Sequence, residues 1–312
     1  MADATRRSII AGAAVAGMGL LAASRTEAKV IEPKTLTENL MYTTARIVGI
    51  NAAGGQFKTG TGFFYQIPLP GSSDQSVPML VTNKHVIKDT THVDFTIHTS
   101  AVMGAAKPDG KHQLRSEAAN WVPHPDPKID LCAVPVGASI NQVKGFFRAL
   151  QPSDLPTEAQ LEELSAVEEI LMVGYPRGLW DATNNYPLIR RGITASHPAV
   201  DHLVDGVPTI VIDAACFPGS SGSPVVLHSV GGYAPKSGGI ALASRTMFLG
   251  VLYSGPIYTQ DGKIVVRNIP TGNEPIPQID LMMNLGYIVK ARELAALCDA
   301  VMVKYQIAAP IK

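Results

Sequence analysis

Short apolar segments separated by turn residues run through most of the chain and constrain its fold more than any other feature. Each segment contains β-branched or aromatic residues and is bounded by Gly, Pro, Asn or Asp, as β-strands are. The first set comprises Thr44–Ile50, Gly60–Ile67, Met79–Ile87 and Val93–His98. The second set comprises Glu169–Tyr175, Leu188–Ala195, Thr209–Ile212, Ser223–Leu227, Phe248–Ser254 and Lys263–Asn268. This spacing predicts an all-β protein with two β units in series.

Two segments of different character join and follow these units. Residues 151–168 are rich in Pro, Glu and Ser, and the stretch after Pro156 predicts a short acidic helix, so we expect the inter-unit connection there. The first unit is then 29–150 and the second 169–288. Val289–Tyr305 carries apolar residues at helical spacing, which predicts a C-terminal α-helix within a final segment, 289–312.

The first 28 residues have the pattern of an export signal. Arg6 and Arg7 precede an apolar run, Ile9–Ala23, that is shorter than the ~20 residues of a bilayer span. Small residues around Ala28 offer a cleavage site. The order Thr5–Ile10 resembles the twin-arginine signal, so we expect a periplasmic or secreted protein with no stable membrane span after signal removal. An uncleaved amphipathic or anchoring helix is the alternative.

Composition excludes several kinds of partner. Lys plus Arg and Asp plus Glu both number 26, so overall charge indicates neither nucleic acid nor a charged membrane surface as a partner. The three cysteines, Cys132, Cys216 and Cys298, match no zinc spacing and imply no disulfide framework. We therefore expect no metal and no other cofactor. The sequence does not indicate the oligomeric state.

The segment Asp213–Pro224 packs small residues densely around Ser221, between two apolar strands. Such a segment makes a sharp turn in which a serine hydroxyl can stand out as a nucleophile. The amides of Gly219 and Ser221 would then face the oxyanion of a tetrahedral intermediate. A Gly/Ser-rich hairpin loop without chemistry is the alternative.

A serine nucleophile needs a base, and the base needs an acid to orient it. Of eight histidines, His85 follows an apolar strand and stands in a polar turn, but position alone does not choose among the eight. Asp130 lies in an otherwise apolar stretch, Ile129–Val136, which predicts an acid inside a strand. Burying it is costly unless it accepts hydrogen bonds, so it is either the orienting acid or a backbone-bonded structural residue.

Four motifs taken together resemble the trypsin-like (chymotrypsin-fold) serine peptidases. They are Gly60-Thr61-Gly62-Phe63, Val81-Thr82-Asn83-Lys84-His85-Val86, Asp130-Leu131-Cys132-Ala133-Val134 and Gly219-Ser220-Ser221-Gly222-Ser223-Pro224. The order His, Asp, Ser is that of this family. The run before the serine is similar to that of the bacterial HtrA peptidases.

The resemblance implies two six-stranded antiparallel β-barrels with the active site between them. His85 and Asp130 would come from the first barrel and Ser221 from the second, and protein or peptide would be the substrate. It also implies that Ala215 and Cys216 face Ser254 and Gly255 across the pocket for P1, the residue before the scissile bond. Because these four carry no charge, a small or medium aliphatic P1 residue is expected.

Other features distinguish the chain from animal trypsins and from HtrA peptidases. Ser220 stands where animal trypsins have an acid, so their zymogen switch is not expected. About 40 residues follow the last predicted strand, Lys263–Asn268, fewer than the PDZ domain that HtrA peptidases append. Arg190 and Arg191 are interpreted as a solvated strand end. An inactive binding or scaffold module and an esterase with the same triad remain as alternative functions.

Overall fold

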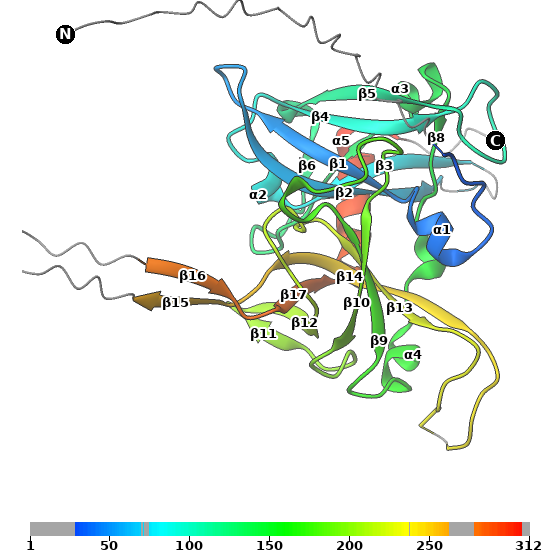
Figure 1. The fold of residues 1–312 in the computed structure, drawn as a ribbon, viewed down its shortest axis with the longest axis vertical. Helices are drawn as coiled ribbons and strands as arrows, with labels where there is room; N and C mark the ends of the chain where they lie inside the picture. The colour runs from blue at the N-terminus through cyan, green and yellow to red at the C-terminus, as the bar shows by residue number, and fades with distance from the viewer. Residues whose placement is uncertain (1–28, 70, 72–74, 237, 262–277, 308–312) are drawn as a thin grey trace, which may run out of the picture.

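The computed structural model describes residues 29–69, 71, 75–236, 238–261 and 278–307 (Figure 1). Two large antiparallel sheets, a two-stranded hairpin, several short helices and a longer C-terminal helix make up this part of the chain. The all-β prediction is therefore confirmed. The expected export signal, 1–28, and the predicted strand Lys263–Asn268 lie outside the described residues.

The first sheet has eight strands in the spatial order β5-β4-β1-β2-β3-β7-β6, with β8 also paired with β4. Its strands are β1 (Thr44–Ile50), β2 (Gln56–Pro68), β3 (Ser76–Thr82), β4 (His92–Thr99), β5 (Gly110–Glu117), β6 (Val122–Pro123), β7 (Cys132–Pro135) and β8 (Gly145–Phe146). Three short helices accompany it: α1 (Leu36–Leu40), α2 (Lys84–Ile87) and α3 (Gly137–Gln142). The sequence did not reveal β5, because most of its side chains are polar and exposed.

The second sheet closes on itself. Its order is β10-β9-β13-β14-β17-β12-β11, and an additional pairing of β10 with β12 joins six of these strands into an antiparallel barrel. The strands are β9 (Glu169–Gly174), β10 (Leu188–Thr194), β11 (His202–Val204), β12 (Val207–Asp213), β13 (Pro224–Ser229), β14 (Arg245–Ser254) and β17 (Leu285–Lys290). A separate hairpin joins β15 (Ile257–Asp261) to β16 (Gln278–Met282).

The connection between the sheets contains the predicted helix. Pro152–Asp154 forms a 3₁₀ turn, and α4 spans Glu158–Glu162. Thr157 and Gln160 form a reciprocal capping box at its start, which satisfies backbone N–H groups that the first turn leaves free. The helix is thus specified locally by its cap.

The C-terminal helix begins later than predicted. β17 continues to Lys290, a 3₁₀ turn covers Ala291–Glu293, and α5 spans Leu294–Lys304. The prediction of helix from Val289 was wrong because Val289 pairs with Thr209 and Val251 in the barrel. An apolar residue at helical spacing can equally face a barrel core, and here pairing with two neighbouring strands makes Val289 part of a strand.

Apolar clusters fill each sheet and also join the two. The joining cluster contains Phe63 and Val81 of the first sheet, Phe248 and Val289 of the second, and Leu297 of α5. The rings of Phe63 and Phe248 meet edge to face, with centroids 5.5 Å apart. The sheets are therefore held in one relative position, which the site described below requires.

Candidate active site

His85 and Asp130 form a hydrogen-bonded pair at the edge of the first sheet. The Nδ1 atom of His85 lies 2.5 Å from Oδ2 of Asp130, and the backbone N–H of His85 donates to Oδ1 at 3.1 Å. Asn83 supports the pair, since its side-chain amide donates to the carbonyl of Asp130 at 2.6 Å. These contacts fix the orientation of the imidazole and leave its Nε2 atom available.

Asp130 does not lie inside a strand, contrary to the prediction. β7 begins at Cys132, and Asp130 stands two residues earlier in the turn after Ile129. Its carboxylate accepts one hydrogen bond from the backbone N–H of His85 and forms a second with the His85 ring. The expectation that the acid must find hydrogen bonds thus agrees with its contacts, although the local structure was misread.

Ser221 lies in the turn between β12 and β13. Backbone bonds within the turn run from Ser220 N–H to the Phe217 carbonyl and from Ser223 N–H to the Ser220 carbonyl. The turn is also tied to β14, because Gly222 donates to the Leu252 carbonyl at 2.8 Å. The serine is therefore held by its own turn and by the wall of the second barrel.

Thr61 of β2 connects this turn to the first sheet, and sequence reasoning assigned it no separate role. It is fully buried, its N–H donates to the Ser221 carbonyl at 2.8 Å, and its hydroxyl donates to the Gly219 carbonyl at 3.1 Å. Its own carbonyl accepts from the Thr82 hydroxyl at 2.7 Å. Thr82 ends β3, three residues before His85. The Ser221 turn and the His85 segment thus meet through Thr61.

Two glycines make this close packing possible. Gly222 has φ +86°, and a Cβ built there would lie 1.9 Å from the Thr61 carbonyl oxygen. Gly219 has φ +89°, and its Cβ position lies 2.7 Å from the Tyr175 carbonyl oxygen. Only glycine fits both the backbone conformation and the space.

The amides of Gly219 and Ser221 donate to no acceptor within the described residues. Both are therefore free to donate to a ligand, as an oxyanion site requires. The hydroxyl of Ser221 also forms no hydrogen bond with another described residue. Catalytic hydrogen bonds commonly form fully only when substrate is bound.

Two of the four residues expected around P1, Cys216 and Gly255, lie close to Gly286 of β17. A Cβ at Gly286 would lie 2.6 Å from the Cys216 sulfur, and a Cβ at Gly255 would lie 3.7 Å from the Gly286 Cα. The segment with Ala215 and the segment with Ser254 therefore flank Gly286. Sequence reasoning missed this glycine, although a glycine within an apolar strand signals a close approach.

The interpretation of Arg190 as a solvated residue was wrong. Arg191 is exposed and pairs with Glu169, as a strand-end residue can. Arg190 is instead partly buried, and its Nη1 atom donates to the Ala215 carbonyl. Its guanidinium carbon also lies 5.0 Å from the centre of the Phe217 ring. A positive charge therefore adjoins the expected P1 residues.

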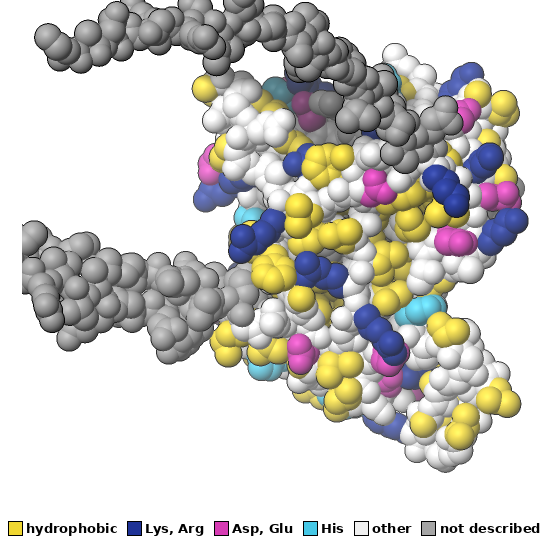
Figure 2. Space-filling view, viewed as in Figure 1, with side chains coloured by type: hydrophobic (Ala, Val, Ile, Leu, Met, Phe, Trp, Pro, Cys, Tyr) yellow, Lys and Arg dark blue, Asp and Glu magenta, His cyan; other side chains and the backbone are white. Residues whose placement is uncertain are grey.

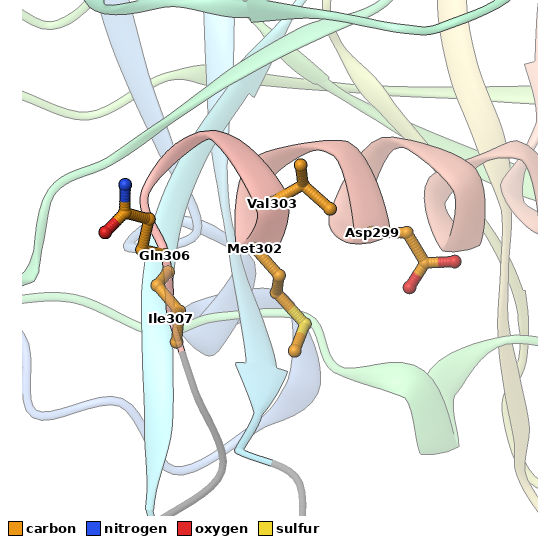
Figure 3. Close-up of a pocket in the computed structure, with 5 residues that line it drawn as sticks. All are labelled: Asp299, Met302, Val303, Gln306 and Ile307. Atoms are coloured by element: carbon orange, nitrogen blue, oxygen red, sulfur yellow. The ribbon is translucent and has the colours of Figure 1, made fainter.

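Two hollows help to locate the chemistry. One of about 500 Å³ borders the His85–Asp130 pair and is also lined by Ile87, Trp121 and Pro123. Another of about 530 Å³ lies along α5, where Figure 3 shows Met302, Val303 and Ile307 with Asp299 and Gln306. The second hollow has no histidine and no nucleophilic side chain. Of these two hollows, only the first is lined by candidate site residues, His85 and Asp130; Ser221 is not among its lining residues.

The described residues include no cluster of three or more His, Cys, Asp or Glu side chains suited to a metal ion. Cys132, Cys216 and Cys298 are buried and unpaired. No helix in the described ranges is long and apolar enough to cross a membrane. On the face drawn in Figure 2, basic and acidic side chains are interspersed among apolar and neutral ones.

A sequence model of the trypsin-like peptidase domain matches residues 60–231, more than half of the chain. The chain belongs to the trypsin-like peptidase family. The matched region begins at the Gly60 motif and contains His85, Asp130 and Ser221. Membership assigns the chain to the peptidases and makes proteins its class of substrate.

Solved structures of the Rv3671c protease from M. tuberculosis are similar to this chain. The active form is 16% identical with a TM-score of 0.40, covering 84% of this chain and 82% of that one. The inactive serine-to-alanine mutant form is 13% identical with a TM-score of 0.40, covering 88% and 91%. No curated protein matches the chain.

Proposed function

We propose that this protein is a serine endopeptidase that cleaves peptide bonds through Ser221, His85 and Asp130. The observation that carries the proposal is the doubly hydrogen-bonded His85–Asp130 pair, positioned beside the Ser221 turn by Thr61. Family membership supports a peptidase, and the three residue types are those that an acyl-transfer triad needs.

In the proposed mechanism, Ser221 Oγ attacks the scissile carbonyl while His85 Nε2 takes the hydroxyl proton. Asp130 holds the imidazole in the required tautomer and stabilises its protonated form. The amides of Gly219 and Ser221 donate to the oxyanion. Collapse of the intermediate breaks the C–N bond, and His85 gives its proton to the leaving amine. Water then hydrolyses the acyl-enzyme on Ser221 by the same steps.

The first prediction concerns Ser221→Ala. Removing the nucleophile should abolish labelling by a fluorophosphonate probe and should lower proteolysis of casein by about 10³-fold or more. Gel fluorescence and release of soluble peptides measure the two effects. Ser153→Ala is a matched control that should change neither effect, because Ser153 is exposed and lies in the connection between the sheets, outside the Ser221 turn.

The same assay separates the alternative functions. Wild-type labelling without proteolysis would favour an esterase with the same triad. Neither labelling nor proteolysis would favour an inactive binding or scaffold module. Labelling that persists in Ser221→Ala would assign the nucleophile elsewhere and overturn the proposal.

The P1 preference stays a prediction. Ala215, Cys216, Ser254 and Gly255 are uncharged, and taken alone they favour a small or medium aliphatic side chain. Arg190, which the sequence-based prediction left in solvent, alters the charge next to these residues.

We also propose export through the twin-arginine route, on the pattern of residues 1–28. Arg6→Lys with Arg7→Lys should retain the protein in the cytoplasm with its full N-terminus. The wild type should reach the periplasm or the medium and lose residues up to about Ala28, which intact-mass measurement on each fraction would test. A cytoplasmic wild type of full mass would contradict export.

A further inference from the structure

Strand alternation directs Arg190 into the second barrel. Side chains alternate between the two faces of a strand, and directly paired residues of neighbouring strands share a face. Arg190 pairs with Met172 of β9, which is 2% exposed and belongs to the barrel core that also contains Ala214 and Cys216. Arg191 pairs instead with Leu171 and lies on the outer face.

The guanidinium of Arg190 reaches the segment expected to form one side of the P1 site. It donates to the Ala215 carbonyl and lies against the Phe217 ring. Its charge also acts on Cys216: burial raises the pKa of this thiol to about 11, while Arg190 acts to lower it. Arg190 therefore adjoins three consecutive residues, two of which were expected to line the pocket.

The charge of Arg190 is not neutralised by the described part of the chain. No ion pair of Arg190 with a described Asp or Glu exists, whereas Arg191 pairs with Glu169. The carboxylate of Asp213 raises the pKa of Cys216, but Asp213 is exposed and forms no ion pair with Arg190. Of the five N–H groups of the Arg190 guanidinium, only one has an acceptor among the described residues, and none of its nitrogens is buried without a partner there. The remaining donors are free to bind a ligand.

A partly buried cation with free donors, next to the uncharged pocket residues Ala215 and Cys216, is complementary to a carboxylate. A planar guanidinium can bind a carboxylate through two parallel hydrogen bonds. A basic P1 side chain would be repelled, and an aliphatic one would leave the donors without acceptors. We infer that Arg190 makes this site selective for an acidic P1 residue, Glu or Asp. The inference rests on the proposed peptidase function and names its class of substrate.

The test is a P1 profile of the full chain with fluorogenic peptides that differ only at P1. A charge-assisted hydrogen bond should make kcat/KM for Glu or Asp about 10- to 100-fold higher than for Leu or Val, with Lys and Arg lowest. Arg190→Gln should reduce the ratio of Glu to Leu to about one, and Arg190→Lys should retain part of it. Arg190→Glu should move the preference towards Lys and Arg.

Arg191→Gln is the matched control and should leave the profile unchanged, because Arg191 lies on the opposite face and is exposed. A wild-type preference for aliphatic P1 residues would overturn the inference. So would an acidic preference that persists in Arg190→Gln. If Arg190→Gln fails to fold because it lacks the Ala215 contact, the P1 profiles of the wild type and of Arg190→Lys still test the acidic preference.

Failure of this inference is distinguishable from failure of the proposed function. If the wild type is labelled by a neutral fluorophosphonate and cleaves after Leu or Val, only the inference of acidic specificity fails. If the wild type is neither labelled nor proteolytic, the proposed peptidase function itself fails. Thermal unfolding and probe labelling of each variant show whether a changed profile comes from a folded site.

Discussion

At the scale of single residues, the nucleophile turn depends on what touches it from the other sheet. Thr61 uses its N–H, hydroxyl and carbonyl to connect the Ser221 turn with the end of β3. Gly222 lies directly against the same carbonyl. The position of Ser221 is therefore set by contacts with the first sheet as much as by the local turn.

We predict that Gly222→Ala disrupts the site. Its φ of +86° and a Cβ position 1.9 Å from the Thr61 oxygen mean that the backbone must move. The variant should lose about 3 kcal/mol of unfolding free energy or more, and most of its fluorophosphonate labelling. Denaturant unfolding and labelling rates measure the two effects.

Gly231→Ala separates close packing from backbone strain. Gly231 has a similar φ of +79°, but no atom lies within 4 Å of its Cβ position. This variant should lose only about 1 kcal/mol and keep its labelling rate. Equal losses in both variants would show that packing on Thr61 does not position the turn.

At the scale of elements, alternation and pairing decide what the sequence pattern leaves ambiguous. Arg190 and Arg191 are adjacent in sequence, yet β10 places one against Ala215 and the other in an exposed ion pair. Two adjacent arginines near a turn indicate a solvated end when composition alone is considered. The pairing of β10 with β9 determines which of them turns inward.

The C-terminal segment shows the same ambiguity between helix and strand. Leu294, Leu297, Cys298 and Val301 form the apolar face of α5, as their spacing predicts. Val289 continues that spacing backwards, but it lies in β17 between β12 and β14. A short apolar run does not distinguish helix from strand. Pairing with β12 and β14 placed Val289 in a strand.

At the scale of the whole molecule, α5 joins the two sheets. It follows the last strand of the second barrel and contacts β6 and β7 of the first sheet (Figure 1). Leu297 is fully buried in the cluster shared by both sheets, and Lys304 donates to the backbone carbonyls of Ala119, Asn120 and Trp121. Because His85 lies in α2 after β3 of the first sheet and Ser221 lies in the turn before β13 of the second, α5 helps to maintain the site without touching it.

We predict that Leu297→Ala lowers the free energy of unfolding by about 2–5 kcal/mol, the range for truncating a buried leucine. Peptidase activity should be lost at a correspondingly lower temperature. Val303→Ala on the same helix should change stability by less than about 0.5 kcal/mol, because Val303 is 79% exposed. Calorimetry with activity measured after each heating step tests both. Equal stability of the two variants would refute this role of α5.

Sequence alone determined the features that depend on local chemistry or on repeated pattern. The regular spacing of strands, the capped helix after Pro156 and the small residues around Ser221 each follow from residue type and spacing. The all-β class with two β units in series was predicted from the strand spacing, and the two-barrel fold from the family resemblance. Contacts between distant segments could not be predicted this way. Tertiary structure decided that Asp130 leaves the strand to meet His85, that Thr61 holds the Ser221 turn, and that Arg190 faces Ala215. Each of these depends on which strands become neighbours, and pairing is selected by the packing of the whole core rather than by any one segment.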